Sequence, residues 1–176
     1  AAEKARMRIW TKMVDEELHP ACAILTFVAS HRHSVIAHGP AATEAFIEKG
    51  PDPLQRERRR AWIEQGYDAP GIATAFKTYD KALSLMESAL AQGPWLAGGS
   101  FSLADVGLIP YVNRLDMLSM SRLWEGTRPR VADWFSRARA RPSFETAIFE
   151  HMPATSRDEM LANGAIGGPE LLRRLH

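Results

Sequence analysis

The sequence has one cysteine, Cys22, among its 176 residues. A single thiol cannot form a disulfide within the chain, and proteins without disulfides are typical of a reducing compartment. Long apolar runs are missing as well. The longest lies within residues 20–30, far short of the roughly 20 residues that cross a bilayer. We therefore expect a cytoplasmic protein with no membrane partner.

Neither sign of charge is in excess, with 22 Lys and Arg against 21 Asp and Glu and a formal net charge of +1. Proteins dedicated to nucleic acids are usually strongly basic, so this balance predicts no nucleic-acid partner. The densest basic run, residues 56–60, is interrupted by Glu57. We interpret it as a solvated helix face.

Metal-binding patterns are scarce. His31 and His33 stand two residues apart, which places them on different sides of a helix, and no cysteine or carboxylate has ligand spacing relative to them. We expect no metal site. Residues 31–53 mix His, Gly and Pro, which predicts a loop with solvated histidines and a short helix at 43–49.

Strand-forming residues are few, because Val, Ile and Thr together occur 23 times and Ala alone 26 times. Apolar residues recur at steps of three and four in residues 3–30, where Pro20 interrupts the pattern, and again in residues 72–92, 103–115 and 127–141. Asp52 followed by Pro53 predicts the start of another helix. The fold class expected is an all-α bundle.

Ser102 and Asp105 have the spacing of a capping box at the start of the helix 103–115. In such a box the Ser side chain accepts from a backbone N–H of the first turn, and the acidic side chain accepts from the backbone N–H of the Ser. Both side chains are then used by the backbone. A structural role is therefore predicted, in preference to a catalytic one.

The segment Gly99-Ser-Phe-Ser-Leu-Ala-Asp105, deep in a helical chain, resembles the C-terminal domain of cytosolic glutathione transferases. Other features agree: Trp95-Leu96 before it, Pro110 in the apolar helix after it, and Arg141-Pro142 near the end. The first helix is similar to that of bacterial members near the lignin β-etherases. The resemblance implies that residues 1–150 form this helical domain and that residues 151–176 are a tail wrapping it.

In that family glutathione is the co-substrate and is held mainly by an N-terminal thioredoxin-like domain. This chain has no counterpart of that domain, and it begins with a helical pattern and without Met. We therefore expect a piece of a longer chain, inactive alone and without catalytic residues of its own. The resemblance further implies a homodimer and a small hydrophobic electrophile as substrate. The alternatives are a non-catalytic interaction module of the same fold and an unrelated helical regulator.

The substrate side of such a domain is formed by its first helix and its capped helix. We expect the electrophile to contact five residues on these two helices: Met7, Trp10, Thr11, Tyr111 and Arg114. For the residues of the first helix, packing in the core or at an interface is the alternative, because an apolar stripe is more often core than pocket.

Overall fold

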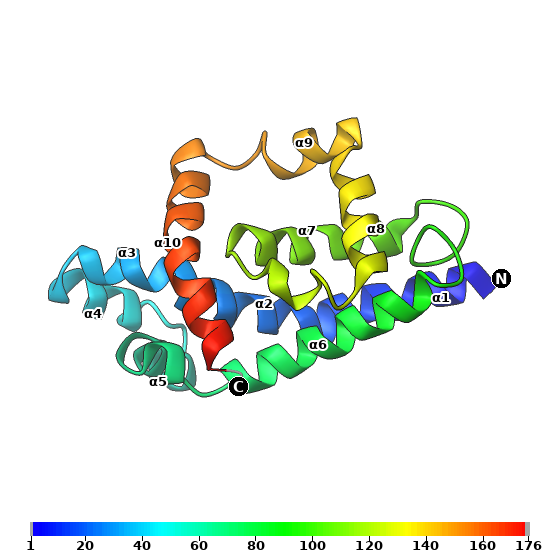
Figure 1. The fold of residues 1–176 in the computed structure, drawn as a ribbon. Helices are drawn as coiled ribbons and strands as arrows, with labels where there is room; N and C mark the ends of the chain where they lie inside the picture. Colours follow the sequence, from blue (N-terminus) through cyan, green and yellow to red (C-terminus); the bar gives the residue numbers. More distant parts are fainter. Residues whose placement is uncertain (1, 175–176) are drawn as a thin grey trace.

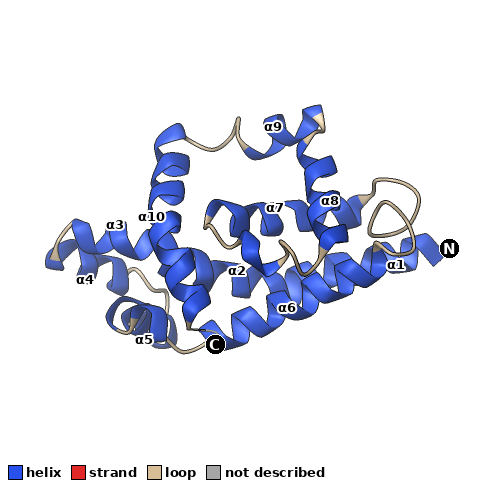
Figure 2. Ribbon diagram, in the orientation of Figure 1, coloured by secondary structure: helices blue, strands red, loops and turns tan. Residues whose placement is uncertain are grey.

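The computed structural model describes residues 2–174, and this part is built from helices without any strand (Figure 2). The predicted all-α fold is confirmed. Residue 1 and residues 175–176, at the ends of the predicted domain and tail, lie outside the described residues. None of the described helices is long and apolar enough to cross a membrane.

The first 36 described residues form one long helical rod (Figure 1). Two π-helical turns interrupt it, so its parts are α1 (Ala2–Met13), η1 (Val14–Leu18), α2 (His19–Thr26), η2 (Phe27–His31) and α3 (Arg32–Ala37). Pro20 lies in the first turn of α2, directly after η1. The rod is buried along one side, at Trp10, Leu18, Leu25 and Val28 among others.

The loop predicted from His31 onward is wrong, because His31–Ala37 continues the helix. Arg32 Nε donates to the carbonyl oxygen of Ile63 at 2.9 Å, and the His33 imidazole bonds the Tyr67 hydroxyl at 3.0 Å. These long-range bonds hold a segment whose polar residues conceal its helical period. The chain turns only at Gly39, where φ is +90°, a conformation that suits glycine.

The middle of the chain follows its local signals closely. Short helix α4 (Pro40–Glu48) precedes α5 (Pro53–Glu64), whose predicted cap is present: Asp52 Oδ1 accepts from the backbone N–H of Gln55 at 2.8 Å. After a short 3₁₀ turn, η3 (Gly66–Asp68), the long helix α6 (Ile72–Ala89) lies along the rod. Its predicted apolar stripe is buried.

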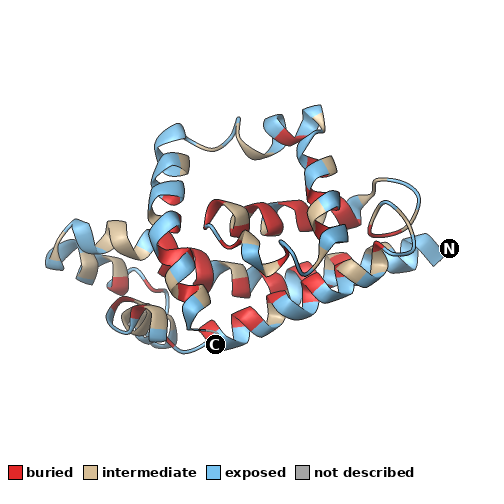
Figure 3. Ribbon diagram, in the orientation of Figure 1, coloured by how far each residue is buried: buried red, intermediate tan, exposed pale blue. Residues whose placement is uncertain are grey.

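Helix α7 (Leu103–Met117) passes through the centre of the molecule, between the rod and the later helices (Figure 3). The predicted capping box is present at its start. Ser102 Oγ accepts from the N–H of Ala104 at 3.3 Å, and Asp105 Oδ2 accepts from the N–H and hydroxyl of Ser102 at 2.9 and 3.0 Å. The box therefore fixes the direction in which the chain enters α7.

Asp105 does more than cap the helix. Its carboxylate is fully buried, and Oδ1 accepts from the backbone N–H of Leu96 at 3.0 Å and from the Trp134 indole at 2.9 Å. The Trp10 indole in turn donates to the carbonyl oxygen of Leu96 at 3.3 Å. The Asp105 side chain thus joins α7, the loop before it and the helix that carries Trp134, and Trp10 attaches the rod to the same loop.

The chain ends with η4 (Ser121–Leu123), α8 (Pro129–Arg139), α9 (Pro142–Ile148) and α10 (Ala154–Arg173). Helix α10 was not predicted as a helix, since Gly164, Gly167 and Gly168 weaken its intrinsic preference. All three glycines are buried where α10 meets backbone: Gly167 faces Ala29 and Gly168 faces Leu118. Helix α10 packs mainly against η2.

Candidate functional site

A polar cluster lies between the rod and the middle of α7. We define it by seven residues, Asp15, His19, Cys22, His31, Tyr79, Tyr111 and Arg114. Four of them belong to η1, α2 and η2, and the two π-helical turns bracket this stretch. A π-helical turn changes the direction of the side chains that follow it and is found frequently at functional sites.

Tyr111 and His19 form the outer part of the cluster. The Tyr111 hydroxyl and His19 Nδ1 are 3.1 Å apart, and the rings meet edge to face with centroids 6.3 Å apart. Burial raises the pKa of the Tyr111 phenol, and Cys22 and Asp15 raise it further. The phenol therefore keeps its proton at neutral pH and can donate a hydrogen bond.

Tyr79 and Cys22 form the inner part. The Tyr79 side chain is buried, its pKa is raised well above the ordinary value chiefly by that burial, and Cys22 adds to the effect. The Tyr79 hydroxyl has no hydrogen-bond partner among the described residues, and neither does the buried Ser30 hydroxyl of η2. Buried polar groups are rarely unsatisfied, so unused hydrogen-bonding capacity here deserves a functional explanation.

Arg114 and His31 form the far end of the cluster. Partial desolvation lowers the pKa of His31, the nearby Arg114 lowers it further, and Glu159 opposes the shift. The imidazole is therefore mostly neutral at pH 7, and Arg114 is the cation of the cluster. A cation beside a protonated phenol is suited to an oxygen atom that carries or gains negative charge.

The structure separates the five substrate residues predicted from the sequence. Met7 lines a hollow of about 190 Å³ beside Ala97 and Ser102. Trp10 is 6% exposed and bonded to the loop before α7. The Thr11 hydroxyl donates to the carbonyl oxygen of Arg8, within its own helix, at 3.1 Å. Contacts of this kind fit the packing role kept as the alternative for the first helix.

Tyr111 and Arg114 lie further along α7. Tyr111 follows the first residue of the helix by eight positions, which corresponds to about 12 Å along the axis. The structure brings these two residues together with His19, Cys22, His31 and Tyr79, which the sequence reasoning did not select. A signal was present, because residues 15, 19, 22 and 26 are spaced four, three and four apart and carry polar or thiol groups.

Within residues 2–174, no group of three or more His, Cys, Asp or Glu side chains is placed to hold a metal ion.

The fold and the cluster define a class: an all-helical domain with a buried, capped central helix and a polar site between that helix and the first one. Comparison with known proteins shows which family has this fold.

The sequence profile of the family described as glutathione S-transferase, C-terminal domain, matches residues 53–137. The crystal structure of the β-etherase LigF from Sphingobium sp. strain SYK-6 superposes with a TM-score of 0.69 at 23% identity, covering 85% of this chain and 63% of that one. This likeness concerns the fold.

Two curated relatives are similar to this chain in sequence. Tetrachloro-p-hydroquinone reductive dehalogenase of Sphingobium chlorophenolicum is 37% identical over 107 residues, which are 58% of this chain and 43% of the relative. Glutathione S-transferase TCHQD of Arabidopsis thaliana is 35% identical over 111 residues, 59% of this chain and 41% of the relative. Residues 53–137 of this chain thus match the C-terminal domain of glutathione S-transferases, and the all-helical fold agrees with that match. The chain spans about two fifths of the length of these relatives.

Proposed function

We propose that this chain is the electrophile-binding part of a glutathione-dependent enzyme that conjugates, cleaves or reduces electrophilic small molecules. The observation that carries the proposal is the bonded pair Tyr111 and His19, on the helix that also carries Arg114 one turn further on, in a chain with this family's domain. Glutathione supplies the thiolate nucleophile, and a separate domain holds it. The isolated chain is then inactive, because it brings no residue that activates the thiol.

The polar cluster acts on the electrophile. Tyr111 donates a hydrogen bond to an oxygen of the substrate, and Arg114 stabilises the negative charge on that oxygen. His31 stays neutral beside Arg114, since its pKa is lowered, and does not add a second cation. Met7 and Thr11 extend the contact along the first helix, and Trp10 supports it from the core.

The name of one relative suggests a substrate class. Tetrachloro-p-hydroquinone is a halogenated aromatic ring with ionisable hydroxyl groups. We propose that this chain binds such rings with one phenolic oxygen between Tyr111 and Arg114. Phenols of this kind are acidic, so the ligand is an anion at neutral pH, which suits a single arginine.

Exposed apolar side chains support a partner domain. Ile9 on α1 and Leu103 and Val106 on α7 are 62%, 59% and 49% exposed. They belong to the two helices that the family uses on its substrate side. We propose that the glutathione-holding domain covers them in a cytoplasmic homodimer. Sedimentation velocity of the full-length parent protein tests the oligomeric state: a dimer is expected, and a monomer at micromolar concentration contradicts it.

The proposal is tested in the full-length parent protein, with 1-chloro-2,4-dinitrobenzene and tetrachlorohydroquinone as electrophiles. Tyr111→Phe removes one hydrogen bond of about 1 kcal/mol, so KM for the electrophile rises roughly fivefold. KM for glutathione changes less than about twofold. The control is Tyr67→Phe, which removes the similar hydroxyl of the His33–Tyr67 pair outside the cluster and changes neither constant.

Two outcomes contradict the proposal. A parent protein that turns over neither electrophile with glutathione favours the non-catalytic interaction module. Equal effects of Tyr111→Phe and Tyr67→Phe on both constants show that the cluster does not contact the electrophile.

A further inference from the structure

Cys22 carries the one thiol of the sequence and belongs to the polar cluster. The residue is half-buried on α2, and its sulfur lies 3.7 Å from the Thr26 hydroxyl, one turn further along. Helix α2 packs against both α6 and α7. Reactive cysteines are partly exposed, whereas cysteines buried in apolar surroundings are inert. The position of Cys22 therefore allows a small molecule to reach its sulfur.

The Tyr79 hydroxyl is buried on the side of Cys22 and has no hydrogen-bond partner among residues 2–174. The side chain is 2% exposed. Burial raises the pKa of the phenol, and Cys22 raises it further, because a thiolate disfavours a second negative charge nearby. Unpartnered buried hydroxyls are rare. This phenol keeps its proton and can donate a hydrogen bond to a thiolate or to a molecule attached to it.

Tyr111 lies near the same thiol from the side of α7. Burial raises the pKa of its phenol, followed by the effects of Cys22 and Asp15. Its hydroxyl pairs with His19 Nδ1 at 3.1 Å, on the more exposed side of the cluster. Two protonated phenols from two helices are therefore close to one sulfur atom.

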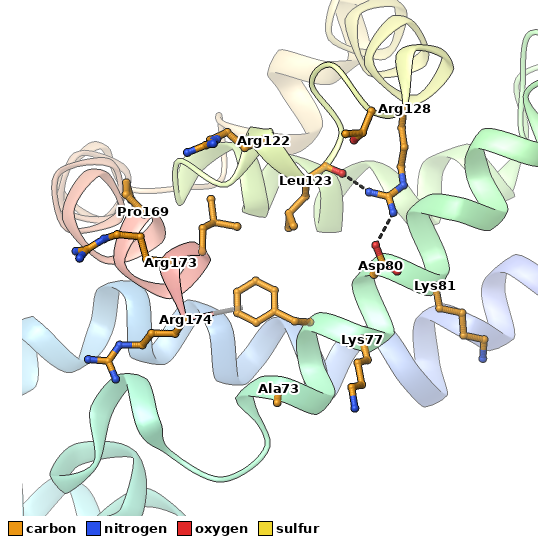
Figure 4. A pocket seen from close by; sticks show the side chains of 13 residues that line it. Ala73, Lys77, Asp80, Lys81, Arg122, Leu123, Arg128, Pro169, Arg173 and Arg174 are labelled. Carbon is orange, nitrogen blue, oxygen red and sulfur yellow. Dashed lines mark hydrogen bonds and ion pairs between the residues drawn. The ribbon is translucent and has the colours of Figure 1, made fainter. Parts of the chain in front are cut away.

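A large cavity along α6 does not reach these groups. It has a volume of about 990 Å³ and is lined by Lys77 of α6 and by Arg128, among others (Figure 4). None of Cys22, Tyr79 and Tyr111 lines it. A molecule that contacts the Cys22 sulfur therefore lies in the polar cluster, where the electrophile is proposed to bind.

We propose that Cys22 is a site of covalent modification, at which the thiol is arylated by aryl halides that carry electron-withdrawing groups. The inference rests on the proposed function, because the ring first binds in the polar cluster. A chain without glutathione then captures the electrophile itself.

The step is a nucleophilic aromatic substitution. The thiol proton passes to solvent, and the thiolate attacks the ring carbon that bears the halogen. A C–S bond forms, the carbon–halogen bond breaks, and the halide leaves with the bonding electrons, so no oxidant or reductant takes part. Arg114 opposes the rise in the pKa of Tyr79, which shows that its charge is felt at this place. It stabilises the negative charge that the ring gains during addition.

The test uses the 176-residue chain without glutathione and 1-chloro-2,4-dinitrobenzene as the probe, with intact-mass measurement of the product over time. We expect one dinitrophenyl group per chain, located on Cys22 by peptide mapping. The rate saturates as the probe concentration rises, because the ring binds before it reacts. Below saturation, the chain reacts about tenfold faster than N-acetylcysteine at the same pH, because binding brings the ring to the sulfur.

Variants separate this site from an ordinary accessible thiol. Cys22→Ser gives no adduct. Tyr79→Phe removes a hydroxyl without a partner, so the fold is kept, and arylation slows about tenfold through loss of a hydrogen bond to a charged sulfur. Tyr67→Phe is the matched control, because its hydroxyl pairs with His33 outside the cluster, and it leaves the rate unchanged.

Three outcomes overturn the proposal: an adduct on another residue, a rate that rises linearly with probe concentration, and equal rates for Tyr79→Phe and Tyr67→Phe. The proposed function is decided separately, by KM of the Tyr111→Phe variant of the full-length parent protein. Absence of the Cys22 adduct with the expected change in KM therefore rejects the modification site alone.

Discussion

Helix α7 has two regions of opposite character. In its first turn, the buried carboxylate of Asp105 accepts four hydrogen bonds, and every donor around it is satisfied. About two turns further on, Tyr111 belongs to the polar cluster, in which the buried Tyr79 hydroxyl has no hydrogen-bond partner among the described residues. In the first region, the polar groups bond one another and connect four segments of the chain. The other keeps hydrogen-bonding capacity that a bound molecule can use.

The difference separates stability from binding along a single helix. A saturated network is worth most when intact, because loss of one member leaves the others buried and unsatisfied. An unsaturated cluster costs stability and is expected where function requires it. Substitutions at the two regions should therefore differ in what they change as well as in how much.

The largest effect is expected from Asp105→Asn. The amide places an N–H group against donors that now meet a carboxylate oxygen, so at least one buried donor loses its partner. We expect the free energy of unfolding to fall by about 3 kcal/mol or more, measured by urea denaturation of the chain. Asp133→Asn is the control, because Asp133 is exposed and pairs only with Arg137 one turn away. Similar midpoints for the two variants would contradict the central role of Asp105.

The next effect concerns the contact of α10 with the rest of the fold. A Cβ at position 168 would overlap the carbonyl oxygen of Leu118. Gly168→Ala should therefore displace α10 and cost about 1–3 kcal/mol. Gly107→Ala is the matched control within α7, since its Cβ would meet only Val14 at 3.8 Å, and it should be neutral or stabilising by up to about 1 kcal/mol. If both substitutions lower or both raise the denaturation midpoint, the result contradicts the close contact between Gly168 and Leu118.

A smaller effect is expected from Ser102→Ala. It removes the acceptor of the Ala104 N–H and one of the four donors to Asp105. Loss of an N-cap side chain typically costs about 1 kcal/mol. Ser100→Ala, two residues earlier and exposed, should leave the midpoint unchanged. A Ser102→Ala variant as stable as Ser100→Ala would show that the backbone alone fixes the start of α7.

The smallest effect is the pH dependence of stability. The pKa of His31 and of His33 is lowered in the folded chain, chiefly by desolvation. The unfolded chain then binds protons more readily than the folded one as pH falls through about 6.5. This part of the stability is complete above that pH and declines below it until the folded imidazoles also protonate. Replacing both histidines by Gln should flatten the unfolding midpoint between pH 7 and 5, and an unchanged slope would contradict these shifts.

The sequence predicted the first region of α7 better than the second. A capping box is a local pattern, so Ser102 and Asp105 could be recognised from their spacing, although the bonds from Leu96 and Trp134 could not. The polar cluster depends on how α2 faces α7, which no local pattern specifies. For that reason Tyr111 and Arg114 were predicted without His19 and Tyr79. The glycines of α10 likewise weaken the local helix signal, because the close contact with backbone far away in the sequence leaves no room for a side chain.

The central claim is that the start of α7 stabilises the fold and its middle contacts the electrophile. The most direct test measures both quantities for both regions: the denaturation midpoint and KM for tetrachlorohydroquinone, in the full-length parent protein with Ser102→Ala and with Tyr111→Phe. We predict that Ser102→Ala lowers the midpoint and leaves KM within about twofold, while Tyr111→Phe raises KM roughly fivefold and leaves the midpoint unchanged. If both variants change the midpoint alone, the middle of α7 is structural and the account is wrong.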